Sequence, residues 1–169
     1  MDTLKAISTR RSIRKYSTEA ISDEILNTLL AAGMDAPSAL DEQPWHFLVV
    51  RNRETLKKLS EFHSHCDLVT EAPTCIILCC DMKLEKLPGF WVQDCSACAQ
   101  NILLAAHAQG LGAVWIGVHP SQGDVDGIRR MFDLTENIIP FCMIAVGYPN
   151  EPYPEKSNFR TDRIHLEKW

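Results

Sequence analysis

Hydrophobic positions along this chain recur at two spacings, one typical of helices and one typical of buried strands. Apolar residues three and four positions apart predict helices at 4–7, 23–33, 53–59, 91–109 and 126–132. Continuous runs of β-branched and aliphatic residues predict strands at 45–50, 74–80, 113–117 and 141–147. Residues 63–73 follow neither pattern and are expected to be irregular. The alternation of helices and strands predicts a single α/β or α+β domain with one mixed sheet.

Capping residues mark the ends of several predicted helices. Asp2, Ser22 and Asn52 each precede a helix, and their side-chain oxygens can accept hydrogen bonds from its first turn. Gly33 and Gly110 follow the last apolar positions of two helices, where glycine commonly ends a helix. These local signals set the predicted helix boundaries.

A short basic segment near the start stands out because the chain as a whole is acidic, with 17 Lys and Arg against 22 Asp and Glu. Arg10–Lys15 holds four cations and the hydroxyl group of Ser12. Taken alone, such a run is most often a solvated basic turn. Guanidinium groups also match phosphate oxygens, and an extended backbone would point Arg10, Ser12 and Arg14 the same way. The segment is therefore a candidate anion-binding site.

Length and composition narrow the classes of function. A chain of 169 residues fits one domain, expected to span 1–169, and its net charge of −5 argues against nucleic acid as the main partner. No apolar run approaches the roughly 20 residues that cross a bilayer, so no membrane association is expected. The opening residues lack a signal pattern, which favours a cytoplasmic protein. The seven cysteines lie partly in apolar runs, which favours reduced, buried thiols.

Two connections and the C-terminal tail are poorly suited to core packing. Residues 35–44 are small and polar between prolines, and residues 81–90 are charged and contain Pro88-Gly89. The second connection is expected to lie near or over a site. The tail after Gly147 is rich in proline and would reach about 75 Å if extended, against a radius of gyration near 15 Å for a compact chain of this length. We therefore expect the tail to dock, and a partner subunit would provide a surface.

Several segments in a fixed order form a pattern more specific than any one of them: Arg10–Tyr16, Ala36–Ala39, Gln43–Phe47, Gln100–Ala106, Gly110–Gly117, Gly147–Pro149 and Arg160–Trp169. The pattern resembles the nitroreductase family of FMN-dependent oxidoreductases over nearly the whole chain. The resemblance implies an α+β fold, with a mixed central sheet flanked by helices and a C-terminal tail extending over the partner subunit. It also implies an obligate homodimer with two FMN sites at the interface.

The resemblance assigns most of the cofactor contacts to the two ends of the chain. Arg10, Arg11, Ser12 and Arg14 match the opening segment that binds FMN. Arg10 and Ser12 are expected at the FMN phosphate together with Arg160 from the tail, and Arg14 is expected nearer the flavin pyrimidine. A cation there supports the negative charge of reduced flavin. Lys156 is a further candidate at the phosphate.

Two other segments are expected to meet the flavin ring. Pro37, Ser38, Ala39 and Gln43 resemble the segment that the partner subunit supplies against the other side of FMN. Ile116 and Gly117 resemble the backbone that passes the flavin edge, where main-chain N–H groups face N5 and O4.

The chain departs from the family pattern at two places. Many relatives carry an acidic residue at the position of Gly117, so side-chain effects near N5 are expected to differ. The lid region around 83–91 matches no known pattern, including the Tyr/Lys/Glu lid of dehalogenating relatives, and acceptor specificity is expected to reside there.

Competing motifs point to thiol or metal chemistry. Cys95-Ser96-Ala97-Cys98 is a CxxC, but it lies in the helix 91–109, which is apolar on most sides, and no second pair follows at zinc spacing. Buried packing residues are the simpler explanation. His63–Cys66 lacks a fourth ligand nearby, and a surface loop is simpler than a metal cluster. Asp94 is expected to line a pocket or cap the helix rather than act as a general acid.

Three hypotheses remain. The first is an FMN-dependent oxidoreductase that uses NADH or NADPH to reduce nitro compounds, quinones or similar acceptors by ping-pong hydride transfer through flavin N5. Such an enzyme needs no metal and no catalytic side chain of its own, because the cofactor performs the hydride chemistry. The second is a flavin-binding protein without turnover that serves storage or regulation. The third is a thiol-redox or metal protein built on the CxxC.

Overall fold

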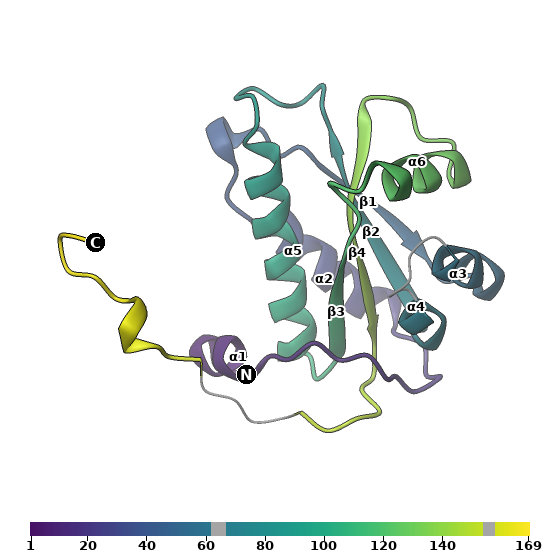
Figure 1. Ribbon diagram of the computed structural model, residues 1–169. Coiled ribbons are helices and arrows are strands. Elements are labelled where there is room, and N and C mark those ends of the chain that lie inside the picture. Colours follow the sequence, from purple (N-terminus) through teal and green to yellow (C-terminus); the bar gives the residue numbers. More distant parts are fainter. Residues whose placement is uncertain (62–66, 154–157) are drawn as a thin grey trace.

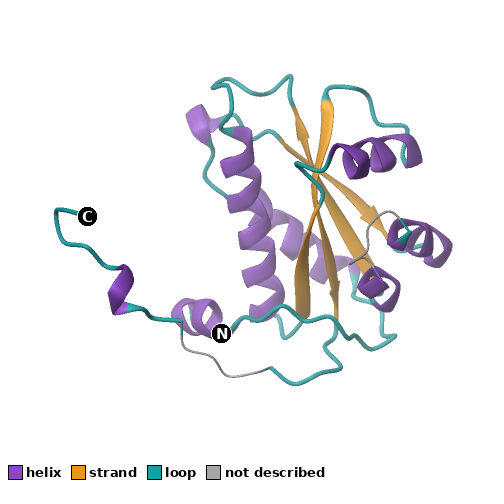
Figure 2. Cartoon of the chain, viewed as in Figure 1, coloured by secondary structure: helices purple, strands orange, loops and turns teal. Residues whose placement is uncertain are grey.

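A sheet of four strands lies between two groups of helices (Figures 1 and 2). The computed structural model describes residues 1–61, 67–153 and 158–169. The helices are α1 Thr3–Thr9, α2 Asp23–Met34, α3 Arg53–Ser60, α4 Asp67–Glu71, α5 Trp91–Ala108 and α6 Gln122–Met131, with short 3-10 turns at Ala39–Asp41 and Thr161–Arg163. The strands are β1 Trp45–Val50, β2 Thr74–Asp81, β3 Gly112–Gly117 and β4 Ile138–Gly147. Helices α2 and α5 cover one face, and α3, α4 and α6 cover the other (Figure 1).

The strands follow the order β1-β2-β4-β3, and each neighbouring pair runs antiparallel. The sheet is therefore not mixed as expected. Among the described residues, parallel pairing is limited to an isolated bridge between Ser12 and Ala113. The register of β2 and β4 shifts between Leu78 and Cys79, opposite Pro140. Proline lacks an N–H for the ladder and is tolerated at such an irregularity, which explains why β4 begins earlier than predicted.

Side chains of the sheet alternate between two hydrophobic cores. On β2, Ile76 and Leu78 pack with α2 and α5, whereas Cys75 and Ile77 pack on the side of α3, α4 and α6. Gly33 lies inside the last turns of α2 rather than after it. An added Cβ there would lie 2.9 Å from Ile102 Cγ1 of α5, so this glycine permits close packing of the two helices.

Most predicted elements are confirmed, with changes at their ends. The side chains of Asp2, Ser22 and Asn52 each accept a hydrogen bond from the first turn of the helix that follows. α4 lies within the stretch expected to be irregular, because a helix of five residues carries little periodic signal. α6 begins at Gln122, four residues before its predicted start. No helix of the described residues combines the length and the apolar character needed to cross a membrane.

Gly112→Ala is expected to destabilise the protein and displace the basic segment from β3. An added Cβ would lie 2.6 Å from Ile13 Cγ2 and 2.7 Å from Ile13 Cβ, and Ile13 is completely buried. Overpacking of this kind costs roughly 1–3 kcal/mol, which thermal unfolding measures as a lower Tm. Gly123→Ala is the control, since its Cβ would enter open space on α6. Equal melting temperatures for the two variants would contradict this packing.

Candidate functional site

The basic segment runs beside β3, with its apolar residues turned inward and its polar residues turned outward. The Ile13 N–H donates to the Ala113 carbonyl at 3.1 Å, and the buried Tyr16 hydroxyl donates to the Ile13 carbonyl. Ser12 and Arg14 are exposed on either side of buried Ile13. The predicted alternation is therefore present at Ser12 and Arg14, whereas Arg10 is half-buried, and the Arg14 Nη1 group also donates to the Ser12 carbonyl at 3.4 Å.

Arg11 has a structural partner. Its guanidinium Nη1 donates to the carbonyls of Ser8 at 2.9 Å and Arg10 at 2.7 Å, at the C-terminal end of α1. A cation at this end of a helix satisfies free carbonyl groups and interacts favourably with the helix dipole. In this chain Arg11 therefore stabilises the C-terminal end of α1. Arg10 is the C-cap of this helix and is half-buried.

His107 joins α1 to α5, a link that the sequence gave no reason to expect. Thr9 Oγ1 donates to the Lys5 carbonyl at 2.6 Å and lies 2.7 Å from His107 Nε2, so His107 donates through Nε2–H. Burial, followed by the positive charges of Arg10 and Arg11, lowers the pKa of His107. The neutral imidazole thus sets the position of α1 directly behind the basic segment.

The edge of β3 that faces away from β4 is open toward its C-terminal end. Along a strand, the main-chain N–H and C=O groups of successive residues point alternately to the two neighbouring sides. The Ala113 carbonyl accepts from Ile13 on the open side, and the Val118 N–H donates to Phe141 on the β4 side. The N–H groups of Trp115 and Gly117 therefore face outward, and neither has a backbone partner among the described residues. Ile116 is buried, whereas Gly117 is exposed with open space where a Cβ would lie. This edge presents main-chain donors to a ligand.

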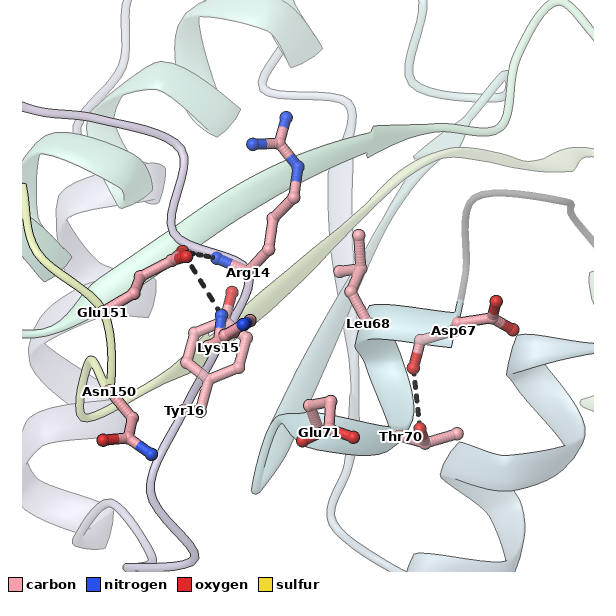
Figure 3. Close-up of a pocket in the computed structure, with 9 residues that line it drawn as sticks. All are labelled: Arg14, Lys15, Tyr16, Asp67, Leu68, Thr70, Glu71, Asn150 and Glu151. Carbon is pink, nitrogen blue, oxygen red and sulfur yellow. Dashed lines mark hydrogen bonds between the residues drawn. The ribbon is translucent and has the colours of Figure 1, made fainter. Parts of the chain in front are cut away.

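A groove of about 780 Å³ lies beside the basic segment (Figure 3). Three segments line it: Arg14–Tyr16, residues of α4, and Asn150–Glu151 after β4. The Glu151 carboxylate accepts from the main-chain N–H groups of Arg14 at 2.5 Å and Lys15 at 3.3 Å. It holds the backbone here while the Arg14 side chain extends away from it (Figure 3). The volume lies in the range typical of small-molecule sites.

The loop between α2 and β1 has a strained backbone. Leu40, Asp41 and Gln43 adopt positive φ angles of 48°, 50° and 44°. Non-glycine residues in this region cost of order 1–3 kcal/mol each, and such strain often occurs at functional sites. Ser38 Oγ accepts from the Gln43 N–H at 3.0 Å, while Pro37 is exposed. We call residues 37–43 the flavin-facing loop, after its expected role.

One chain does not bring the flavin-facing loop together with the basic segment. The Ala39 N–H donates to Asp94 in the first turn of α5, whereas Arg10 and Arg11 act on His107 in its last turn. At 1.5 Å per residue, these two turns lie about 20 Å apart along the helix. The structure therefore groups the basic segment with the start of β3 and the groove, and it places the flavin-facing loop at the other end of α5, toward which β3 runs (Figure 1).

The C-terminal tail extends away from the body of the chain (Figure 1). Arg160 is exposed, and its Nε lies 3.2 Å from Asp162 Oδ1, a neighbour on the same tail. Large apolar side chains along the tail face solvent, namely Phe159, Ile164, Leu166 and the fully exposed Trp169. The expected role of Lys156 lies outside the described residues. A tail of this composition has the surface of a segment that packs on another molecule.

The CxxC is buried, as predicted. Cys95 and Cys98 are completely buried, and burial raises the pKa of the Cys98 thiol to about 12. The pKa of Cys95 is also raised, first by a hydrogen bond with Cys80 and then by burial. Reactive cysteines have lowered pKa values and access to solvent, so this pair lacks the properties of a redox dithiol. His63–Cys66 lies outside the described residues, and the residues that are described contain no group of three potential metal ligands.

Comparisons with known proteins agree with the fold and the motifs. The model of the Nitroreductase family matches residues 7–65 and 63–148. A protein of Methanothermobacter thermautotrophicus, described as a candidate NADH dehydrogenase/NAD(P)H nitroreductase, is 57% identical over all of this chain and 88% of its own length. The crystal structure of a candidate NADH oxidase from Clostridium acetobutylicum aligns with a TM-score of 0.95 and 43% identity, over 97% of this chain and 99% of that one. A candidate nitroreductase from Desulfovibrio desulfuricans, solved in complex with FMN, aligns with a TM-score of 0.86 and 32% identity, over 99% and 97%.

Proposed function

Since this chain belongs to the nitroreductase family, we propose that it is an FMN-dependent oxidoreductase that uses NADH or NADPH to reduce electron-poor acceptors such as nitro compounds or quinones. Residues 1–169 form its single FMN-binding domain. The observation that carries the proposal is the open edge of β3, where the outward N–H groups of Trp115 and Gly117 continue along the strand from the bridge between Ser12 and Ala113.

The residues present fit FMN on chemical grounds. A phosphate needs cations and a close neutral donor, and Arg10 and Ser12 supply them on the outward side of the segment. The flavin edge carries hydrogen-bond acceptors, and the outward Gly117 N–H beside open space is a matching donor. Arg14, from the same segment, is one of the residues that line the groove (Figure 3). Phosphate, ring edge and pyrimidine thus each have a partner on one side of the chain.

We further propose that each FMN is shared between two subunits. The flavin-facing loop and the basic segment lie at opposite ends of α5, so the loop of one subunit contacts the FMN held by the other. Pro37, Ser38, Ala39 and Gln43 provide these contacts. Exposed apolar residues occur where such a partner would pack, on α1 at Leu4 and Ile7 and along the tail. Arg160 joins the phosphate from the docked tail.

The protein's own contribution is to bind FMN, to orient its ring and to tune its reactivity. FMN, when bound, would supply the redox chemistry, which is hydride transfer between NAD(P)H and an electron-poor acceptor in ping-pong order. Arg14 places a positive charge where reduction adds negative charge to the flavin. The Gly117 N–H would hold the ring edge, and the open space at its missing Cβ leaves room for the ring. The connection of residues 82–90, which we call the lid segment, borders the acceptor position.

The visible spectrum of the purified protein tests the proposed function. Absorbance peaks of oxidised flavin are expected, followed by bleaching on anaerobic addition of NADH or NADPH and recovery on addition of a quinone. Steady NAD(P)H consumption with acceptor separates an enzyme from a flavin-storage protein. A colourless protein that gains no activity with added FMN would overturn the proposal.

The cysteines are expected to be dispensable for turnover. Replacing Cys95 and Cys98 together by alanine removes small buried groups that make no proposed cofactor contact themselves, so acceptor reduction stays near the parent rate. The cost is a modest loss of stability from the cavities left behind. Steady-state rates on the FMN-loaded variant measure this, and abolished activity in a folded, FMN-loaded protein would restore the dithiol hypothesis.

A further inference from the structure

Two buried carboxyl groups meet between the flavin-facing loop and α5. Glu42 is 4% exposed and Asp94 is 5% exposed, and their side chains lie close enough for a hydrogen bond between them if one carries a proton. Glu42 Oε1 and Asp94 Oδ2 have no N–H or O–H donor among the described residues. Ionised carboxylates accept but cannot donate hydrogen bonds. Contact between these two groups therefore requires one proton between them.

The remaining oxygens of this carboxyl pair hold two different segments. Asp94 Oδ1 accepts from the Ala39 N–H at 3.0 Å, which holds the flavin-facing loop on α5. Glu42 Oε2 accepts from the N–H groups of Lys86 at 2.6 Å and Leu87 at 3.1 Å, both in the lid segment.

A second set of contacts also joins the lid segment to the flavin-facing loop. Lys86 Nζ donates to the carbonyls of Leu40 and Asp41 at 3.1 Å each, from the lid segment back to the flavin-facing loop. These are the residues whose backbone is strained. The carboxyl pair and the lid segment therefore add to the contacts within the loop that hold these strained residues in place.

We propose that Glu42 and Asp94 share a single proton that couples the flavin-facing loop to the lid segment, which makes both of them positioning residues for the reaction. This inference rests on the proposed function in one respect, the assignment of the loop to FMN and of the lid to the acceptor. The coupling itself is a property of the protein fold. When the proton is present, the flavin-facing loop and the lid segment move as one unit.

The electrostatic surroundings favour one proton on the pair. Burial and the neighbouring charges of Glu42 and Glu85 raise the pKa of Asp94. Burial opposes ionisation of Glu42, but the N–H groups of Lys86 and Leu87, the hydrogen bond from Asp94 and the charge of Lys86 outweigh it and lower the pKa of Glu42. Asp94 thus carries the proton and donates it to ionised Glu42. The carboxylate of Asp41 accepts from Gln43 Nε2 instead.

These directions fix how the coupling depends on pH. The stabilisation from Asp94, whose pKa is raised on folding, is lost as pH rises through that raised value. The stabilisation from Glu42, whose pKa is lowered, is lost as pH falls through the lowered value. The coupling is therefore strongest between the two, and it weakens on the alkaline side by repulsion between two buried carboxylates.

Hydrogen exchange of the full-length protein, followed by mass spectrometry, tests the coupling without relying on turnover. In Glu42→Ala, exchange is expected to rise about tenfold or more in both the flavin-facing loop and the lid segment, because hydrogen bonds to a charged group are lost. Strand β2 should keep its protection and serves as the internal reference. A rise confined to one of the two segments would overturn the coupling.

Asp94→Asn is the matched variant. Its amide can donate to Glu42 and accept from Ala39, so it imitates the protonated acid at every pH. Over about pH 4–10, a range that spans ordinary carboxyl pKa values and those above them, the parent is expected to lose protection in both segments at alkaline pH, and Asp94→Asn is not. Equal alkaline loss in both proteins, or none in the parent, would overturn the shared proton.

The test also separates this inference from the proposed function. Coupled, pH-dependent exchange in a protein that neither binds FMN nor consumes NAD(P)H would support the shared proton and contradict the proposed function. An active flavoprotein whose two segments exchange independently would support the proposed function and contradict the coupling. In an active enzyme, Glu42→Ala should raise the KM for the acceptor by more than Asp94→Asn does.

Discussion

Removal of residues 155–169 is expected to release FMN and dissociate the dimer together. The tail carries Arg160, proposed at the phosphate, and the exposed side chains of Phe159 and Trp169, proposed to pack on the partner. Ligand binding and subunit association stabilise the same folded assembly, so each loss weakens the other. Sedimentation velocity of the truncated protein, with and without excess FMN, measures both effects.

Two single substitutions separate the contributions of the tail. Arg160→Ala should weaken FMN binding while the dimer persists, whereas Trp169→Ala should weaken the dimer first. A large apolar anchor buried in a partner's pocket can carry much of an interface's energy, and Trp169 is fully exposed in the single chain. A truncated protein that remains a dimer and retains FMN would refute the proposed role of the tail.

Arg10→Ala is expected to weaken FMN binding much more than it unfolds the protein, and Arg160→Ala should do the same. A hydrogen bond to a charged group contributes roughly 1.5–3 kcal/mol, so each loss should cost about one to two decades in affinity. Fluorescence titration of the FMN-free protein measures the affinity, and thermal unfolding without FMN measures stability.

Arg130→Ala is the control for the loss of one positive charge. Arg130 is exposed on α6, which covers the face of the sheet opposite α5 (Figure 1). Its removal changes net charge equally but touches no proposed cofactor contact, so FMN affinity should stay within the error of the parent. If Arg10→Ala and Arg130→Ala behave alike, the phosphate site is placed wrongly.

Local signals in the sequence were sufficient for much of the fold. The caps at Asp2, Ser22 and Asn52 act within one helical turn, so three neighbouring residues define them. The direction of strand pairing depends on distant segments, which is why a mixed sheet was expected where the strands pair antiparallel. Gly33 looked like a helix end because its packing partner, Ile102, lies on another helix.

In the candidate site, too, features set by local sequence could be predicted and features set by distant segments could not. The alternation of Ser12, Ile13 and Arg14 could be predicted, since an extended backbone alone determines it. The carboxyl pair could not, because Glu42 and Asp94 are brought together only when the flavin-facing loop packs on α5. Nothing in the local sequence distinguishes Glu42 from the neighbouring acid Asp41. Residues that act through distant partners become visible only in the folded chain.

Sedimentation velocity with detection at the protein and flavin wavelengths tests the central claim, an FMN site built from two subunits, most directly. The flavin absorbance of the full-length protein is expected to sediment entirely with the dimer, at one FMN per chain, and to leave the protein boundary when dilution produces monomers. Flavin that sediments tightly bound to a monomer, in a preparation that still turns over NAD(P)H, would contradict the shared site.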